Sequence, residues 1–330
     1  MTDSSQPPKV EMPITIENAD LAWFGMDESN PVAPELMGFC AAVLRAIAPS
    51  PERVQLVVTG DFVASVRKRS ITEHQQQNYD VARSSGVVGA KTMPRPDGTI
   101  DVITPAWWFM GDDDPAVVLE REAMAKRTIA HEAFHVAMEQ AGEAECAYEH
   151  EPWARQNMLA IADSVIAEYR AESAVNPSLR NNPDLAWDPV ELITHLRDAL
   201  RRIAKIEYQA HLDVSRLVYD VGQECSNMWK AMAYLVVQQL NDGDSIEPLS
   251  DDATSDLTWS QMVGDHWARF TAILLAIPRG NVRVERNSLE PSVEALADEF
   301  FEWLETFGFR WRDTTDGDTE FLIVNWRFLA

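Results

Sequence analysis

Two histidines and a glutamate stand at a spacing that suits metal-assisted hydrolysis, in the string His131-Glu132-Ala133-Phe134-His135. Residues at i and i+4 of a helix lie about 40° apart around its axis, so both imidazoles reach the same side. Zinc binds imidazole nitrogens at about 2.0–2.1 Å. Glu132 flanks the pair, where a carboxylate can take a proton from an activated water. The motif predicts a zinc site with His131 and His135 as ligands and Glu132 as general base.

The residues around the motif resemble the extended signature of the zincin metallopeptidases, with Thr128 three places before His131 and uncharged neighbours on both sides. The metzincin subclass continues with a glycine three residues after the second histidine and another histidine three residues later. Met138 and Ala141 occupy these positions, which excludes that subclass. The alternative without chemistry is a helical core in which two buried histidines are simply hydrogen bonded.

A catalytic zinc site needs a third protein ligand, because such sites combine three side chains with one water. Glu168 and Glu172 lie one turn apart in a helical pattern and border its apolar side, where an unpaired carboxylate is costly. The string from Glu168 to Glu172 (EYRAE) resembles the E-x-x-A-D motif of gluzincins, whose first Glu binds zinc. The resemblance implies Glu168 as ligand and Glu172 as a residue that orients a ligand histidine. The final Glu in place of Asp keeps Glu172 open as the alternative ligand, and His150 is a further candidate.

The same resemblance bears on substrate and mechanism. Zincins bind extended peptide along an antiparallel edge strand through main-chain hydrogen bonds, so the expected partner is a peptide or protein substrate. The oxyanion formed during peptide hydrolysis needs a second donor, typically a His, Tyr or Arg. The sequence offers candidates for this donor without ranking them: Tyr169, His150, His195, His211 and His266.

Local signals predict the elements that position these residues. Asp114 before Pro115 is typical of a helix start and Gly142 of a helix end, so the motif lies in a helix over 115–141. Two β-like runs, 86–93 and 99–104, flank a proline-glycine turn and predict a hairpin before that helix. Further helices are expected over 34–48, 152–175, from 189, over 213–240, 259–277 and 291–306, with a strand at 53–59, a loop or exposed helix at 67–83, an acidic loop at 241–257 and a terminal hairpin from 309–313 and 319–328.

The order of these elements, strands first and then mostly helices, predicts an α+β fold that is mainly helical. Residues 1–12 read as a disordered tail. The resemblance implies a zincin-like core over 13–176, with a small twisted sheet followed by the active-site helix and the third-ligand helix. Residues 177–330 form a mainly helical region that ends in a β-hairpin and resembles no family. That region is open to several roles: covering a cleft, binding a protein partner, or forming a homo-oligomer.

Composition narrows the class of protein. The 330 residues carry 28 Lys and Arg against 53 Asp and Glu, a formal net charge of −25, which disfavours binding to nucleic acid or to an anionic membrane. The three cysteines, Cys40, Cys146 and Cys225, show no paired spacing and are expected to be reduced and buried. The sequence lacks an apolar run of membrane-spanning length and a secretory leader pattern, so a cytoplasmic location is expected.

Together these features predict a cytoplasmic zinc-dependent metallopeptidase, a hydrolase that uses Zn²⁺ and Glu132 to cleave peptide bonds. The alternative is a zincin-like scaffold that has lost catalysis and acts as a protein-interaction module. The intact His131, Glu132 and His135 favour the enzyme.

Overall fold

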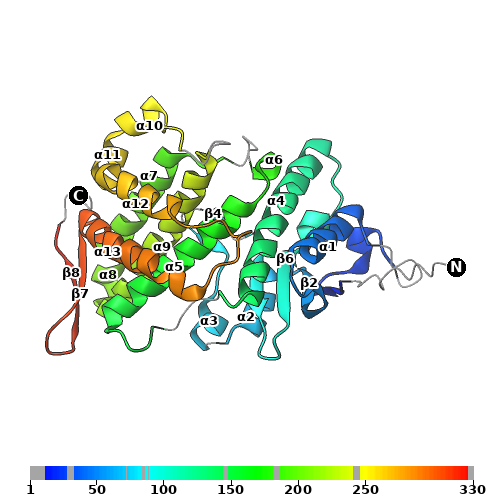
Figure 1. Ribbon diagram of the computed structural model, residues 1–330, viewed down its shortest axis with the longest axis horizontal. Coiled ribbons are helices and arrows are strands. Elements are labelled where there is room, and N and C mark those ends of the chain that lie inside the picture. The colour runs from blue at the N-terminus through cyan, green and yellow to red at the C-terminus, as the bar shows by residue number, and fades with distance from the viewer. Residues whose placement is uncertain are drawn as a thin grey trace. The chain divides into compact units, whose positions relative to one another are not determined.

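The fold confirms the predicted α+β class. A computed structural model describes residues 12–27, 33–71, 73–83, 86–87, 89–143, 148–180, 186–240 and 246–325. Within these ranges the chain is mainly helical, with one four-stranded sheet and a C-terminal hairpin (Figure 1). The predicted disordered tail lies outside the described residues, apart from Met12. The chain forms two compact units, one of Met1–Val81, Val88–Gly142 and Val175–Asn182, the other of Ala82–Val87, Glu143–Ala174 and Pro183–Ala330.

The first unit is built on a mixed sheet with the strand order β1-β2-β6-β5. Its strands are β1 Ile14–Glu17, β2 Val54–Thr59, β5 Lys91–Pro94 and β6 Ile100–Pro105. The first two pair in parallel, as do β2 and β6, whereas β5 pairs antiparallel with β6. This pair matches the predicted hairpin in its second strand and its turn, but the first strand begins at Lys91, because Gly86–Val87 forms a separate short strand that pairs with Ala82–Arg83. Gly98 in the turn has the positive φ of 77° that favours glycine. The strands β1 and β5 are the two edges of the sheet. The sequence analysis did not predict β1.

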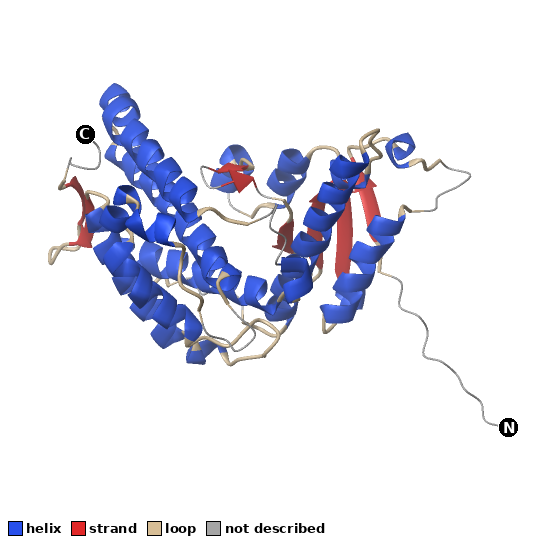
Figure 2. Ribbon diagram, turned by 90° about the horizontal axis from the view of Figure 1, so that it is seen from above, coloured by secondary structure: helices blue, strands red, loops and turns tan. Residues whose placement is uncertain are grey.

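Helices cover both faces of this sheet (Figure 2). On β2, Leu56 and Val58 point into a core with α1 Glu35–Ile47 and α4 Pro115–Gln140, whereas Val57 points into a smaller core with α2 Phe62–Arg69. This alternation is the two-residue period of a strand that is buried on both faces. The first unit also contains α3 Glu73–Asn78, α6 Pro177–Arg180 and the short 3₁₀ turns Leu21–Phe24, Pro51–Arg53 and Ala106–Phe109.

The second unit is a helical assembly around α5 Trp153–Ala174, which packs against α9 Val214–Gln238 and α13 Glu290–Thr306. Its core is aromatic: the Trp229 ring stacks on Phe300, with centroids 3.9 Å apart and planes within 6°. The helix α5 belongs to the second unit, and Val175–Asn182 after it belongs to the first. The predicted domain boundary at residue 176 stays a prediction. The remaining elements are β3 Ala82–Arg83, β4 Gly86–Val87, α7 Pro189–Arg202, a π-helical turn Ile203–Glu207, α8 Tyr208–His211, α10 Asp251–Ser255, α11 Leu257–Met262, α12 Gly264–Leu275, a 3₁₀ turn Arg286–Ser288, β7 Phe309–Asp313 and β8 Thr319–Ile323.

Two predictions for the second unit were wrong in detail. The helix expected over 259–277 is broken at Val263, whose φ of −126° and ψ of −38° separate α11 from α12. The acidic stretch 241–257 was expected to be a loop, but α10 forms within its described part. The Ser250 side chain caps α10 by accepting the Ala253 N–H at 3.2 Å. The terminal hairpin is confirmed for β7 and β8, and residues 326–328 of its expected second strand lie outside the described residues.

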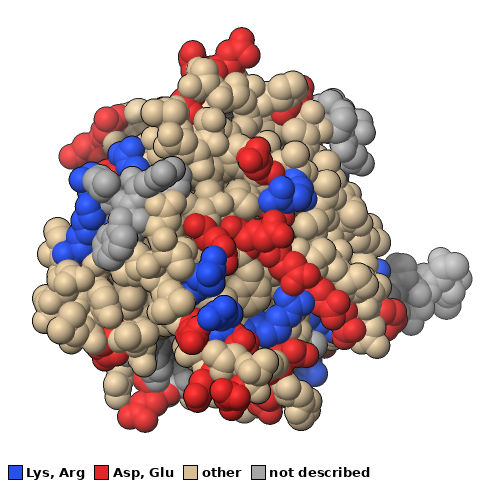
Figure 3. Space-filling model, turned by 90° about the vertical axis from the view of Figure 1, so that its left-hand side faces the viewer, with Lys and Arg blue, Asp and Glu red and all other residues tan. Residues whose placement is uncertain are grey.

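The surface carries charges of both signs (Figure 3). On the face drawn in Figure 3, basic side chains lie among acidic ones, and no extended basic patch is seen there. Ion pairs such as Arg310–Glu305, 2.7 Å apart, are typical of this mixture.

Cys40 and Cys225 are free and buried, as predicted, and burial raises the pKa of the Cys40 thiol to about 12. The third cysteine, Cys146, lies outside the described residues.

Candidate metal centre

The helix that carries the motif forms where the sequence predicts it. The Asp114 carboxylate caps α4 by accepting the Ala116 N–H at 2.9 Å, and Pro115 occupies the first helical position. The helix ends at Gln140, with Ala141 as its C-cap and Gly142, at a φ of 77°, after it. Since α4 runs without a break, His131 and His135 keep the i, i+4 relation that the prediction requires.

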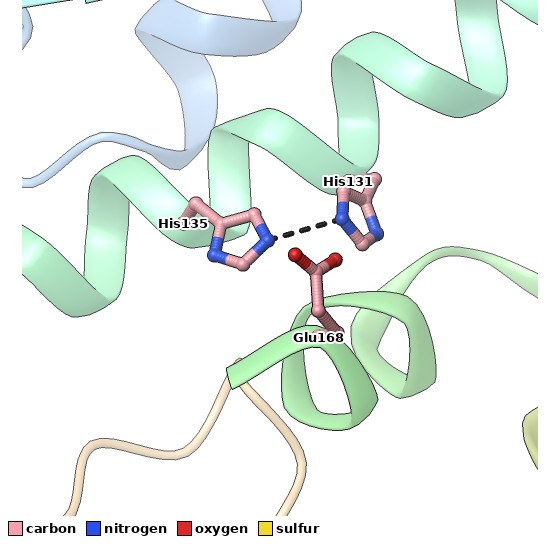
Figure 4. A group of neighbouring side chains, drawn as sticks. All are labelled: His131, His135 and Glu168. Atoms are coloured by element: carbon pink, nitrogen blue, oxygen red, sulfur yellow. Dashed lines mark hydrogen bonds between the residues drawn. The ribbon is translucent and has the colours of Figure 1, made fainter. Parts of the chain in front are cut away.

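The two imidazoles of the motif face each other. The Nε2 atoms of His131 and His135 lie 3.0 Å apart, and the ring centroids 4.7 Å apart (Figure 4). Two nitrogens on one tetrahedral zinc would lie roughly 3.3 Å apart, given bonds of about 2.0–2.1 Å. The His131 side chain is buried, at 8% exposure, which limits competition from water. This geometry fits a shared divalent ion, provided that both Nε2 atoms are unprotonated.

Glu168 on α5 is the third member of the group. One carboxylate oxygen of Glu168 and one ring nitrogen from each histidine all lie within 4.8 Å of one another. Its carboxylate points toward the two rings in Figure 4. Two imidazoles and one carboxylate are the donor set of a His₂Glu catalytic zinc site. The three residues therefore suit zinc in number and in chemical type.

The other two candidate ligands lie outside this group. Glu172, one turn after Glu168 on α5, is buried at 3% exposure. His150 is exposed and follows Tyr148 in a turn. Among the described residues, the one group of at least three metal-ligating side chains contains Glu168 and neither of these two. The assignment of Glu168 as the third ligand stays a prediction.

The Glu132 side chain is hydrogen bonded to a residue of strand β5, a contact that the H-E-x-x-H motif alone does not indicate. The Thr92 hydroxyl, on the edge strand β5, donates a hydrogen bond of 2.6 Å to Glu132 Oε2. Glu132 is buried, at 7% exposure. Because 40 positions separate the two residues, no local pattern in the sequence connects them. The contact places the predicted base beside the edge strand.

Glu168 also has neighbours that sequence reasoning missed. The Tyr234 hydroxyl on α9 donates a short hydrogen bond to Glu168 Oε2. Lys230, one turn earlier on α9, lies with its Nζ 4.0 Å from Glu168 Oε1. The i, i+4 spacing of Lys230 and Tyr234 was readable as a shared helix face, but nothing in the sequence pairs that face with α5.

The candidates for a second donor lie in varied surroundings. Tyr169 is buried at 3% exposure in the helical core, and His195 is exposed on α7, 3.8 Å from Glu191. His211 accepts the backbone N–H of Asp213 at 2.9 Å. His266 is buried, and both of its ring nitrogens face oxygen atoms of the protein. Since these partners occupy His211 and His266, the structure favours neither as the donor.

Comparison with known proteins adds no further constraint, because no family model, curated protein or solved structure matches the chain. None of the helices within the described ranges combines the length and apolarity that crossing a bilayer requires.

Proposed function

We propose that this protein is a zinc-dependent metallopeptidase of gluzincin type, with His131, His135 and Glu168 as ligands and Glu132 as general base. The observation that carries the proposal is the convergence of three zinc-type donors, within 4.8 Å of one another, around the H-E-x-x-H motif. A zinc ion bound there would supply a Lewis acid that polarises a carbonyl and lowers the pKa of water toward ~7.

The chain's own residues supply the remaining steps. Glu132 takes the proton of the attacking water and passes it to the leaving amine, which is the role of a base positioned beside the reaction. The hydrogen bond from Thr92 holds one oxygen of Glu132, so the other oxygen stays oriented for this transfer. Burial of Glu132 and His131 excludes bulk water and strengthens these interactions.

The edge strand β5 supports a peptide as substrate. It is the last strand of its sheet and pairs on one side with β6. An extended peptide can add to such an edge through main-chain hydrogen bonds. Because Thr92 belongs to β5 and contacts Glu132, a peptide added there would lie close to the base.

The test combines metal analysis with hydrolysis of a peptide library, with and without chelator. We expect one zinc per chain and cleavage that the chelator abolishes. Glu132→Gln should retain zinc and lower kcat by about 10²–10⁴-fold, because the proton acceptor is lost. The matched control is Glu122→Gln, on the same helix and paired with Lys126 rather than with the motif.

The outcomes separate the two functional classes. Unchanged turnover in Glu132→Gln would refute its role as base. Zinc binding by the wild-type chain without cleavage of any peptide would favour the alternative, a zincin-like scaffold that binds a protein partner. Absence of zinc binding would refute the metallopeptidase.

A further inference from the structure

Two side chains of α9 approach the carboxylate of Glu168 from the same helix face. Tyr234 donates its hydroxyl to Oε2, and Lys230 brings its ammonium group to within 4.0 Å of Oε1. These contacts lie within the second compact unit, where α5 packs against α9. The two oxygens of one carboxylate therefore face two different kinds of donor, one neutral and one charged.

The Tyr234 side chain is held in place by its surroundings. Its ring stacks on Trp187, with centroids 5.8 Å apart and planes 27° apart. Trp187 is in turn anchored to α9, because its backbone N–H donates to Gln238 Oε1 at 2.8 Å and its carbonyl accepts from Gln238 Nε2 at 3.3 Å. The phenol is thus a preorganised donor, which loses little conformational entropy when Glu168 is fixed.

The Tyr234 hydroxyl and the Lys230 ammonium group should affect a cation bound to Glu168 in different ways. A carboxylate that binds a metal through one oxygen keeps the other for a hydrogen bond, and such outer partners orient the ligand. The neutral phenol supplies this bond without cancelling the charge of Glu168. An ammonium group attracts the same carboxylate but repels a divalent ion, and that repulsion persists over several ångströms.

We propose that α9 sets the metal affinity of the site through these two residues, which act in opposite directions. Tyr234 is a positioning residue that fixes Glu168 for coordination and raises the affinity for zinc. Lys230 lowers the affinity by competing electrostatically for the same carboxylate. The inference rests on the proposed function, since it requires Glu168 to be a ligand.

The experiment measures the zinc dissociation constant of the full chain by competition with a chromophoric chelator, at one pH and ionic strength. Tyr234→Phe should weaken zinc binding by about 10–100-fold, the usual cost of losing an outer partner. Lys230→Met should strengthen it by about 3–10-fold, and the gain should shrink at high salt. Tyr219→Phe and Arg216→Met are matched controls, because both residues are exposed on the same helix.

A double-mutant cycle tests whether Tyr234 acts through Glu168. In a Glu168→Ala background, Tyr234→Phe should cause no further loss of affinity, because the acceptor of the Tyr234 hydrogen bond is already gone. Equal losses in both backgrounds would overturn the inference, as would a zinc affinity of Tyr234→Phe within twofold of wild type. An unchanged or weakened affinity in Lys230→Met would overturn the role of Lys230.

These failures differ from failure of the proposed function. If the wild-type chain binds no zinc, the metal centre and this inference fall together. If it binds zinc and the α9 variants behave as the wild type does, the metal centre stands and this inference alone fails. Circular dichroism of each variant checks that the helices are retained.

Discussion

Two buried histidines, His131 on α4 and His266 on α12, differ in what their ring nitrogens face. Their exposures are nearly the same, 8% and 6%. Around His266, Nδ1 lies 2.6 Å from Glu299 Oε1 and Nε2 lies 2.8 Å from Thr306 Oγ1. Around His131, Nε2 lies 3.0 Å from the Nε2 of His135.

The difference separates a structural histidine from a candidate ligand. Both ring nitrogens of His266 have protein partners, Glu299 and Arg269 at Nδ1 and Thr306 at Nε2, and the ring also stacks on Trp303 with centroids 5.2 Å apart. Two nitrogens turned toward each other, with a carboxylate nearby, present donors to a common point. Burial alone would not have told these two sites apart, so the identity of the partner atoms carries the assignment.

The strongest test of the comparison is the loss of metal. His131→Gln should weaken zinc binding by more than about 100-fold, since it removes one of the three proposed ligands. His266→Gln should bind zinc as the wild type does, because the His266 ring contacts Glu299 and Thr306 rather than the proposed ligands. Equilibrium dialysis with metal analysis measures both variants. Equal zinc loss in the two would break the distinction.

For the free energy of unfolding, the loss of His266 should matter more than the loss of a histidine from the proposed metal centre. His266→Ala should lower the free energy of unfolding by about 2–4 kcal/mol, because it removes two hydrogen bonds and a stacked ring from a buried position. In metal-free protein, His135→Ala should cost less, about 1 kcal/mol, since that side chain is only half-buried. Chemical denaturation with zinc excluded measures both.

His195→Ala is the control for the stability comparison. This histidine is exposed on α7, with 51% side-chain exposure, so its removal should change the unfolding free energy by no more than about 0.5 kcal/mol. A larger cost for His135 than for His266 would contradict the assignment of His266 as the structural one.

Local signals in the sequence were sufficient for the elements that carry the histidines. The Asp114 cap and Gly142 delimit α4 within one residue of the prediction, and helical spacing alone brings His131 and His135 together. The hairpin of β5 and β6 was likewise visible from its turn residues. By contrast, β1 is a four-residue strand that exists through parallel pairing with β2, a contact that local patterns cannot reveal.

The remainder of the site depends on contacts between distant parts of the chain. Glu168 was implied by a family resemblance, and its choice over Glu172 depended on a weak pattern. Tyr234 meets Glu168 across 66 positions, and Thr92 meets Glu132 across 40. Neither Tyr234 nor Thr92 belongs to a motif, because each is defined only by which helix or strand packs beside the other.

The smallest expected effect concerns the stability of the protein at acidic pH, through the buried Glu299 that contacts His266. Burial opposes ionisation of Glu299, but hydrogen bonds from His266 and Arg269 outweigh it and hold the pKa of this carboxyl below its ordinary value of 4.5. A lowered folded-state pKa adds stability above about pH 4.5, and this contribution disappears as the pH falls through the folded value. The wild type should therefore lose stability more steeply below pH 4.5 than Glu299→Gln does.

A matched variant isolates this effect from the general acid response of so acidic a chain. Glu302→Gln removes a carboxylate that also meets Arg269, at 3.3 Å, but is exposed on the same helix. Denaturation curves from pH 6 to pH 3 should give Glu302→Gln the wild-type slope and Glu299→Gln a shallower one. Because both variants change the net charge equally, a difference between them reports the contacts of Glu299 with His266 and Arg269. Identical slopes would mean that Glu299 contributes no more than a surface charge, and the view of His266 as enclosed by strong partners would lose its support.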